Sequence, residues 1–175
     1  MSVTVKRVGT RALIVDLPDL QTVMDFYAAL SATPLPRQTD VVAAARTVLV
    51  TFDSPTATTN AIDVLANYSP DTADVGSPRD IEIDVRYDGE DVEALAASLG
   101  MSRNELIDWH TSTTWVAAFG GFAPGFTYCV PEDASRALAI PRRDSPRTAV
   151  PAGAVALAGE FSAVYPRTSP GGWQL

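Results

Sequence analysis

Short stretches of the first half of the chain alternate hydrophobic with polar residues or are briefly all apolar, as strands do. These stretches are 3–8, 12–15, 41–45 and 47–52. Two further segments carry apolar residues at helical spacing, which predicts two amphipathic helices. Their apolar positions are Leu20, Val23, Met24, Tyr27 and Leu30 in the first, and Ala61, Ile62, Leu65 and Tyr68 in the second. The first half is therefore predicted to contain strands, a helix, two strands and a helix.

Both helices are preceded by start signals. In Asp16-Leu-Pro-Asp19, Pro18 is expected near the first helical position and Asp19 in the first turn. Ser54, which precedes a proline, is expected to be the N-cap of the second helix.

The second half contains two predicted helices. The first spans about 90–99, and Gly100 is expected to end it in a left-handed conformation. The second begins with Ser102 and Glu105 at the spacing of a capping box. It ends at His110, where a protonated imidazole would meet the negative end of the helix dipole. This structural role for His110 is favoured over catalysis.

The segment 69–78 is rich in Pro, Asp, Gly and Ser, which predicts a connector between two lobes, 1–78 and 79–175. The stretch 81–85 then alternates apolar and charged residues, which predicts a half-exposed strand. This strand either closes the sheet of the first lobe, giving a split βαβ of the ferredoxin type, or opens the second lobe. Later strands are short and separated by Gly and Pro turns, which indicates a small barrel or sandwich. They are expected at 113–119, 126–130, 149–150, 155–158 and 163–165.

Aromatic residues are concentrated in the Gly- and Pro-rich run 119–128, and a second turn-rich run follows at 141–173. Tight turns can bring aromatic rings to one side, near arginine-bearing loops, and so shape an apolar recess with cationic edges. Arginine suits such an edge because its planar guanidinium binds carboxylates and phosphates bidentately. In the alternative interpretation the aromatic residues form the core of a turn-rich β domain. The candidate substrate-binding residues are Phe122, Pro124, Phe126, Tyr128, Arg142, Arg143 and Arg147.

Composition excludes several classes of function. The net charge of −8 and pI near 4.5 argue against general nucleic-acid binding or attachment to a membrane surface. Cys129 and His110 are the only residues of their types, so an internal disulfide, a cysteine metal cluster and a paired-histidine zinc site are excluded. Acidic residues in 80–91 are expected on a solvent-facing strand, and no metal site is predicted. Without a leader or a long apolar run, the chain is expected to be cytoplasmic.

Several motifs in one order resemble a known family. They are Gly121-Phe-Ala-Pro-Gly-Phe-Thr-Tyr128, Pro141-Arg-Arg143, Ser145-Pro-Arg147, Val150-Pro-Ala-Gly153, Tyr165-Pro166 and Ser169-Pro-Gly-Gly-Trp173. With this order and spacing over about 80–175, the chain resembles allophanate hydrolase subunit 1, also called the B subunit of 5-oxoprolinase or KipI-like. The resemblance implies an α+β fold, with a ferredoxin-like N-terminal lobe followed by a cyclophilin-like β-barrel lobe.

The resemblance also implies a function that depends on other chains. The expected activity is ATP-dependent opening of 5-oxoproline to glutamate, or action on another small cyclic or linear amide. It requires a subunit 2/C (KipA-like) partner in a hetero-oligomer, with ATP used at the level of the complex. The alternatives are a KipI-like module that inhibits a histidine kinase, and an assembly subunit of a urea-carboxylase-type carboxyltransferase. His110 and Glu160 are the candidate general acid/base residues.

Two departures from the family pattern bear on these expectations. Where relatives usually carry Gly-Gly-Gln-Thr-Gly-Ile before the Tyr-Pro pair, this chain has 158–164, with Glu160 in place of an amide side chain. Relatives also continue past Gly-Gly-Trp with a further strand-forming tail. The barrel is therefore expected to lack its last strand and to show an unpaired edge, which a partner chain covers or which stays open.

Overall fold

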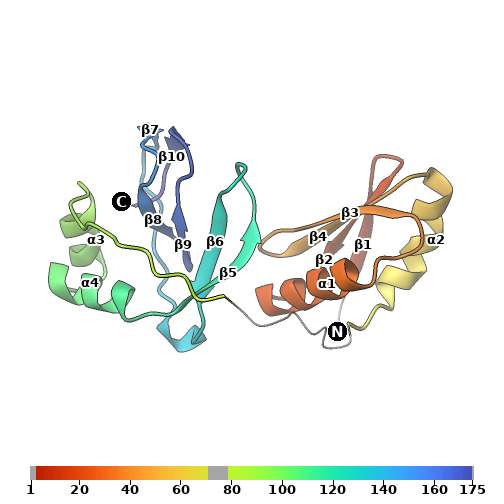
Figure 1. Ribbon diagram of the computed structural model, residues 1–175, viewed down its shortest axis with the longest axis horizontal. Helices are drawn as coiled ribbons and strands as arrows, with labels where there is room; N and C mark the ends of the chain where they lie inside the picture. Colours follow the sequence, from red (N-terminus) through yellow and green to blue (C-terminus); the bar gives the residue numbers. More distant parts are fainter. Residues whose placement is uncertain (1–2, 71–78, 175) are drawn as a thin grey trace. The chain divides into compact units, whose positions relative to one another are not determined.

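The structure is a computed structural model, and it describes residues 3–70 and 79–174. The chain divides into two compact units, Met1–Asp80 and Ile81–Leu175, each of which is described by itself (Figure 1). Both are mixed α/β units built on antiparallel sheets.

Unit 1 is a four-stranded antiparallel sheet with two helices. Its elements are β1 Thr4–Val8, β2 Ala12–Asp16, α1 Leu20–Ala32, β3 Gln38–Ala43, β4 Thr47–Phe52 and α2 Pro55–Ala66. The strand order is β1-β2-β4-β3, so the two hairpins meet where β2 pairs with β4. Alternate residues of β2 and β4 are buried, and both helices contact the sheet. The period-two pattern in the sequence is therefore confirmed as a sheet with one buried face.

The helix starts of unit 1 are set by short polar side chains. Ser54 Oγ accepts a hydrogen bond from the Ala57 N–H, which confirms the predicted N-cap of α2. In α1 the N-cap is Asp19, whose carboxylate accepts from the Thr22 N–H at 2.8 Å. Helix α1 therefore begins at Leu20, so Asp19 is the N-cap instead of a first-turn residue, and Pro18 lies before the cap instead of near the first helical position.

The buried face of α1 differs by one position from the prediction. Phe26 is fully buried, whereas Tyr27 is 40% exposed. Val23, Phe26 and Leu30 share the face that packs on the sheet, at the i, i+3, i+7 spacing of a helix. The prediction of Tyr27 as a core residue is wrong. The apolar positions in the sequence fit two neighbouring faces of the helix, one with Phe26 and one with Tyr27, and packing on the sheet buries the face with Phe26.

The predicted strand at 81–85 is absent: these residues form no strand in the structure. The sheet position beside β2, where a closing strand of unit 1 would pair, is taken by β1. Ile81 and Ile83 are consequently 81% and 60% exposed. A segment with alternating apolar and polar residues forms a strand only if it pairs with the edge of a sheet. Residues 81–85 pair with neither the sheet of unit 1 nor a sheet of unit 2. The ferredoxin-like and cyclophilin-like assignments of the two lobes stay predictions.

Unit 2 combines two helices with two antiparallel sheets. Its elements are α3 Val92–Ser98, α4 Arg103–Thr111, β5 Trp115–Gly120, β6 Thr127–Pro131, the 3-10 helix η1 Ala134–Arg136, β7 Arg147–Val150, β8 Val155–Ala158, β9 Phe161–Val164 and β10 Ser169–Gly171. One sheet has the order β5-β6-β9-β8, and β10 pairs with β7 in the other. The capping box of α4 is confirmed: Ser102 and Glu105 each accept a hydrogen bond from the other's backbone N–H.

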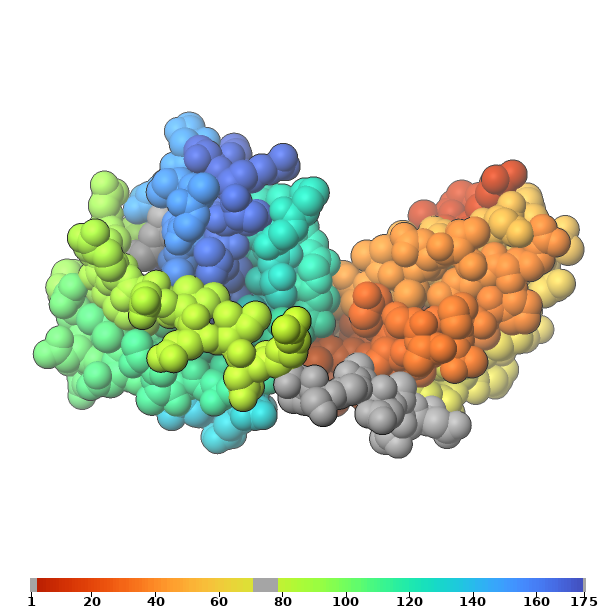
Figure 2. Space-filling model, in the orientation of Figure 1, coloured from red at the N-terminus to blue at the C-terminus, as the bar shows by residue number. Residues whose placement is uncertain are grey.

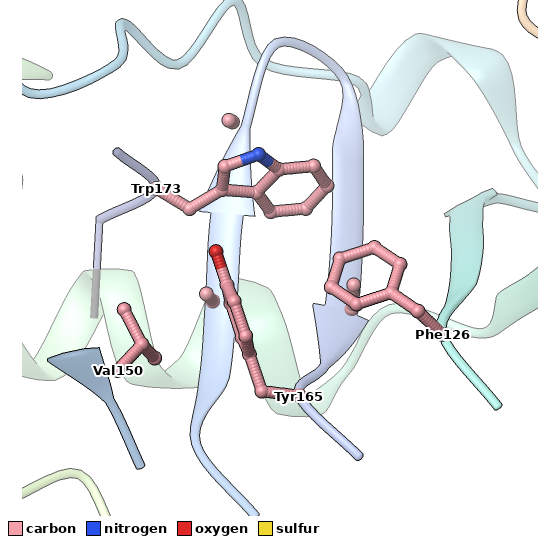
Figure 3. Packing of buried hydrophobic residues seen from close by; sticks show 7 residues of the cluster. Phe126, Val150, Tyr165 and Trp173 are labelled. Carbon is pink, nitrogen blue, oxygen red and sulfur yellow. The ribbon is translucent and has the colours of Figure 1, made fainter. Parts of the chain in front are cut away.

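An aromatic cluster forms one of the two cores of unit 2 (Figure 3). The Phe126 ring meets the Tyr165 ring edge-to-face with centroids 5.2 Å apart, and it meets the Trp173 ring at 5.6 Å. Gly171 in β10 permits this packing, because a Cβ at that position would overlap the Tyr165 hydroxyl. The second core lies between α3, α4 and β8.

Replacing Gly171 by alanine is expected to destabilise unit 2. The added methyl group has to displace the buried Tyr165 ring, which costs about 1–3 kcal/mol of unfolding free energy. Gly172→Ala is the matched control, since its Cβ would lie 3.6 Å from Pro146 Cβ in ordinary contact. Chemical denaturation of both variants checks the prediction, and equal stability of the two would contradict it.

Candidate functional site

A cavity of about 460 Å³ lies within unit 2. Its walls are the segment 84–89, the helices α3 and α4, the loop 151–154 and strand β8. Figure 2 shows the first of these segments, in yellow-green, running across one face of unit 2. Most of the lining is apolar, with Val92, Leu95 and Leu106 supplied by the helices. An apolar cavity with a few polar groups is the usual form of a small-molecule site.

His110 lies in the wall of this cavity, where α4 ends, and is only 7% exposed. Its Nδ1 lies 2.5 Å from the Tyr87 hydroxyl, and its Nε2 lies 3.1 Å from Ser162 Oγ in β9. The Trp115 ring packs against the imidazole with centroids 5.1 Å apart. Hydroxyl groups on both nitrogens and an aromatic ring on one side fix the orientation of the imidazole.

Burial keeps this imidazole neutral. It lowers the pKa of His110 from 6.5 to about 4, and it raises the pKa of Tyr87. The predicted cationic role of His110 at the helix dipole is therefore wrong, because desolvation outweighs the attraction of the helix C-terminus. A neutral imidazole carries one N–H donor and one acceptor, so it donates to one hydroxyl and accepts from the other.

Tyr87 and Ser162 are functional candidates that the sequence did not reveal. Tyr87 lies in the irregular segment before α3, where its carbonyl accepts a hydrogen bond from Arg103 Nη2 at 2.6 Å. Ser162 is buried opposite Leu157 in the β8–β9 hairpin. Neither belongs to a recognisable motif. They lie 23 and 52 residues from His110 in the sequence.

Glu160 is exposed in the turn between β8 and β9 and does not line the cavity. The structure brings Ser162, two residues further along, to His110 instead. Of the two candidate general acid/base residues, only His110 therefore lies in the wall of this cavity.

The aromatic residues predicted to shape a recess divide between core and surface. Phe126 is buried at the centre of the aromatic core, and Tyr128 packs against that core. Pro124 is exposed, and the Phe122 side chain is 60% exposed on a backbone with φ of 60°. A phenylalanine in this left-handed region is strained. The core interpretation therefore holds for Phe126 and Tyr128, whereas Phe122 and Pro124 are exposed and do not line the cavity.

The three arginines predicted to bind substrate differ in their surroundings. Arg143 and Arg147 both form ion pairs with the buried carboxylate of Asp91, which lies just before α3. The pKa of Arg147 is raised mainly by its hydrogen bonds to Asp91. Arg142 is exposed, and its charge lowers the pKa of the nearby Tyr165, which burial raises more strongly.

Metal-binding clusters and membrane-spanning helices are both absent from the part of the chain that the structure describes. Within 3–70 and 79–174, no group of three or more His, Cys, Asp or Glu side chains has the geometry to hold a metal ion. No described helix has the length and apolar character needed to cross a membrane.

Comparisons with known proteins place the chain in a family. The family described as carboxyltransferase domain, subdomain C and D, matches residues 3–175. The chain is 45% identical over 100 residues to the B subunit of 5-oxoprolinase from Bacillus subtilis (strain 168), covering 55% of this chain and 41% of that protein. It is 44% identical over 102 residues to the B subunit of 5-oxoprolinase from Escherichia coli O157:H7, covering 55% and 45%.

Solved structures agree at the level of the fold. A crystal structure of TTHA0988 matches with a TM-score of 0.73 and 30% identity, over 94% of this chain and 34% of that chain. Urea carboxylase of Kluyveromyces lactis matches with a TM-score of 0.69 at 16% identity, over 99% of this chain and 18% of that chain, and shows the fold alone. The chain spans less than half the length of the curated relatives it matches. It belongs to the carboxyltransferase subdomain C and D family, and its expected kinship with the B subunit of 5-oxoprolinase is confirmed.

Proposed function

We propose that this chain serves as the B subunit of a 5-oxoprolinase-type complex. The complex opens the lactam ring of 5-oxoproline to glutamate at the expense of ATP, and the chain is inactive without a subunit 2/C partner. The names of its relatives support the reaction. The structural observation that supports the site best is the position of His110 in the wall of an apolar cavity. Its buried imidazole, whose pKa is lowered, lies between the hydroxyl groups of Tyr87 and Ser162.

The hydroxyl groups of this site suit the uncharged lactam amide of 5-oxoproline, and the carboxylate of that substrate needs a separate contact. An amide offers a carbonyl acceptor and an N–H donor, and the Tyr87 hydroxyl in the cavity wall can serve either. Both nitrogens of His110 are already engaged with hydroxyls, and an imidazole with a pKa of about 4 is a weak base at neutral pH. His110 is thus a positioning residue that fixes the hydroxyls of Tyr87 and Ser162.

The residues that line this cavity do not suit ATP. A triphosphate needs backbone N–H cradles or free cations. Arg143 and Arg147 are engaged by Asp91, and the cavity is lined by Asp84 and Asp88. The nucleotide is therefore assigned to another component of the complex. Exposed Phe122, Pro124 and Arg142 are proposed to contact the substrate carboxylate or the partner, and the complex is proposed to work in the cytoplasm.

Reconstitution tests this function. ATP hydrolysis that depends on 5-oxoproline is expected only when the chain, the subunit 2/C partner and the third component are combined, and not with the chain alone or with the pair. A stable pair that gives no turnover in the full mixture contradicts the oxoprolinase activity. Reduced autophosphorylation of a histidine kinase on adding the chain identifies the KipI-like alternative. Carboxyl transfer to urea identifies the carboxyltransferase alternative.

A further inference from the structure

The side chain of Tyr165 is buried, but its hydroxyl group has no hydrogen-bond partner among the described residues. The residue is 2% exposed, and its ring packs in the aromatic core of unit 2 (Figure 3). Within 3–70 and 79–174, every side-chain polar atom that is shut off from solvent forms a hydrogen bond, and the Tyr165 Oη forms none. The hydroxyl therefore reaches the protein surface at the end of an otherwise buried ring.

Gly171 and Phe122 border the Tyr165 side chain without supplying that partner. A Cβ at position 171 would overlap the Tyr165 hydroxyl, so the glycine in β10 is what leaves the hydroxyl uncovered. The Phe122 ring meets the Tyr165 ring edge-to-face with centroids 6.3 Å apart, and the Phe122 side chain is exposed. The hydroxyl is thus a free polar atom next to a bare glycine backbone, on a ring that an exposed aromatic side chain borders.

Arg142 brings a positive charge near the same hydroxyl. Hydrogen bonds of 3.2 and 2.8 Å tie the segment 141–143 to 172–174, one on each side of Arg142. Burial raises the pKa of Tyr165, and the nearby charge of the exposed Arg142 lowers it in part. The hydroxyl consequently stays protonated at neutral pH and is able to donate a hydrogen bond.

We propose that Tyr165 and Arg142 form a binding site for the carboxylate of a small organic acid. A carboxylate accepts hydrogen bonds on both oxygens, so it complements a hydroxyl donor and a guanidinium together. The exposed Phe122 ring offers an apolar contact to the body of the ligand. A chain of net charge −8 repels a doubly charged phosphate more strongly than a singly charged carboxylate. The choice of 5-oxoproline as the acid rests on the proposed function.

This site is separate from the cavity at His110. Ser162, which contacts His110, and Ala163 are neighbours in β9, so their side chains point to opposite faces of the sheet. Ala163 belongs to the same core cluster as Tyr165. An acid bound at Tyr165 is therefore a separate molecule from one whose amide contacts Tyr87, and each site can be tested with its own variant.

An NMR titration of the isotope-labelled chain with 5-oxoproline tests the site. We expect the backbone amide signals of Arg142, Tyr165 and Gly171 to shift on binding, and the uncharged methyl ester of 5-oxoproline to bind there about tenfold more weakly or not at all. Tyr165→Phe removes only the hydroxyl, and Arg142→Gln removes only the charge. Each is expected to weaken binding at these signals about tenfold or more. Because the hydroxyl has no partner in the described chain, Tyr165→Phe is expected to unfold at the same urea concentration as the unchanged chain.

Two further variants are controls. Arg11→Gln removes an exposed charge from unit 1, and Tyr87→Phe removes the hydroxyl in the cavity wall. Both are expected to bind the acid at Tyr165 as the unchanged chain does. The proposal is overturned if the acid and its ester bind equally, if Tyr165→Phe and Arg142→Gln bind normally, if only Tyr87→Phe loses binding, or if these signals do not shift. Binding without turnover in the complete complex defeats only the proposed reaction, whereas turnover without binding at Tyr165 defeats only this site.

Discussion

Replacing Asp91 by asparagine is expected to lower the free energy of unfolding by about 3–5 kcal/mol. The Asp91 side chain is 7% exposed and is contacted by two guanidinium groups, those of Arg143 and Arg147. Their side chains are 31% and 16% exposed, so both cations are partly desolvated. Removing the carboxylate leaves the two guanidinium groups with only the exposed Glu90 carboxylate, which contacts Arg147, and it unties the 143–147 loop from the start of α3.

Glu90→Gln is the control for the Asp91 variant. Glu90 reaches the same Arg147 at 3.4 Å, but its side chain is 89% exposed. An exposed ion pair contributes no more than about 1 kcal/mol, so this variant is expected to remain nearly as stable as the unchanged chain. Urea unfolding of both variants at neutral pH measures the difference. A loss below about 1 kcal/mol for Asp91→Asn would show that the loop is held by other contacts.

Acid is expected to destabilise the protein through His110. The pKa of this histidine is about 4 in the folded protein, against 6.5 as the ordinary value. Between these values the unfolded chain binds a proton that the folded one excludes, so the free energy of unfolding falls as pH drops from 6.5 towards 4. The loss from this one group approaches about 3 kcal/mol at the acid end of the window.

The His110→Gln variant separates this effect from that of the carboxylates. Asp53, Glu105 and Asp133 have lowered pKa values from their hydrogen bonds, and they also lose stabilising charge in acid, but they are the same in both proteins. The difference in unfolding free energy between the two proteins should therefore shrink as pH falls from 7 to 4. Parallel curves over that window would mean that His110 is protonated as readily in the folded state as in the unfolded state.

Local signals in the sequence predict the helices well. The Ser54 cap and the capping box from Ser102 to Glu105 depend on contacts within one helical turn, and both are confirmed. Strand β10 was not predicted, because its Ser-Pro-Gly sequence carries no strand pattern and pairs with β7 only through tertiary packing. The 81–85 segment shows the opposite case, in which a strand pattern finds no edge to pair with.

The candidate site could be predicted only in part. Sequence pointed to His110 because it is the only histidine, but its neutral state follows from burial that no local pattern encodes. Its partners, Tyr87 and Ser162, come from an irregular segment and from another strand. The arginines illustrate the same limit, because their positive charge predicts a site for an anionic ligand. In the structure, Arg143 and Arg147 instead form ion pairs with Asp91, which lies more than 50 residues earlier in the chain.

The central claim is that this chain is a necessary component of a 5-oxoprolinase-type complex. The most direct measurement is glutamate formation from 5-oxoproline and ATP by the subunit 2/C partner and the third component, with and without this chain. We expect no product until the chain is added, and then a rate proportional to its concentration up to a fixed stoichiometry. Equal rates with and without the chain, or no product in the complete mixture, would contradict the claim.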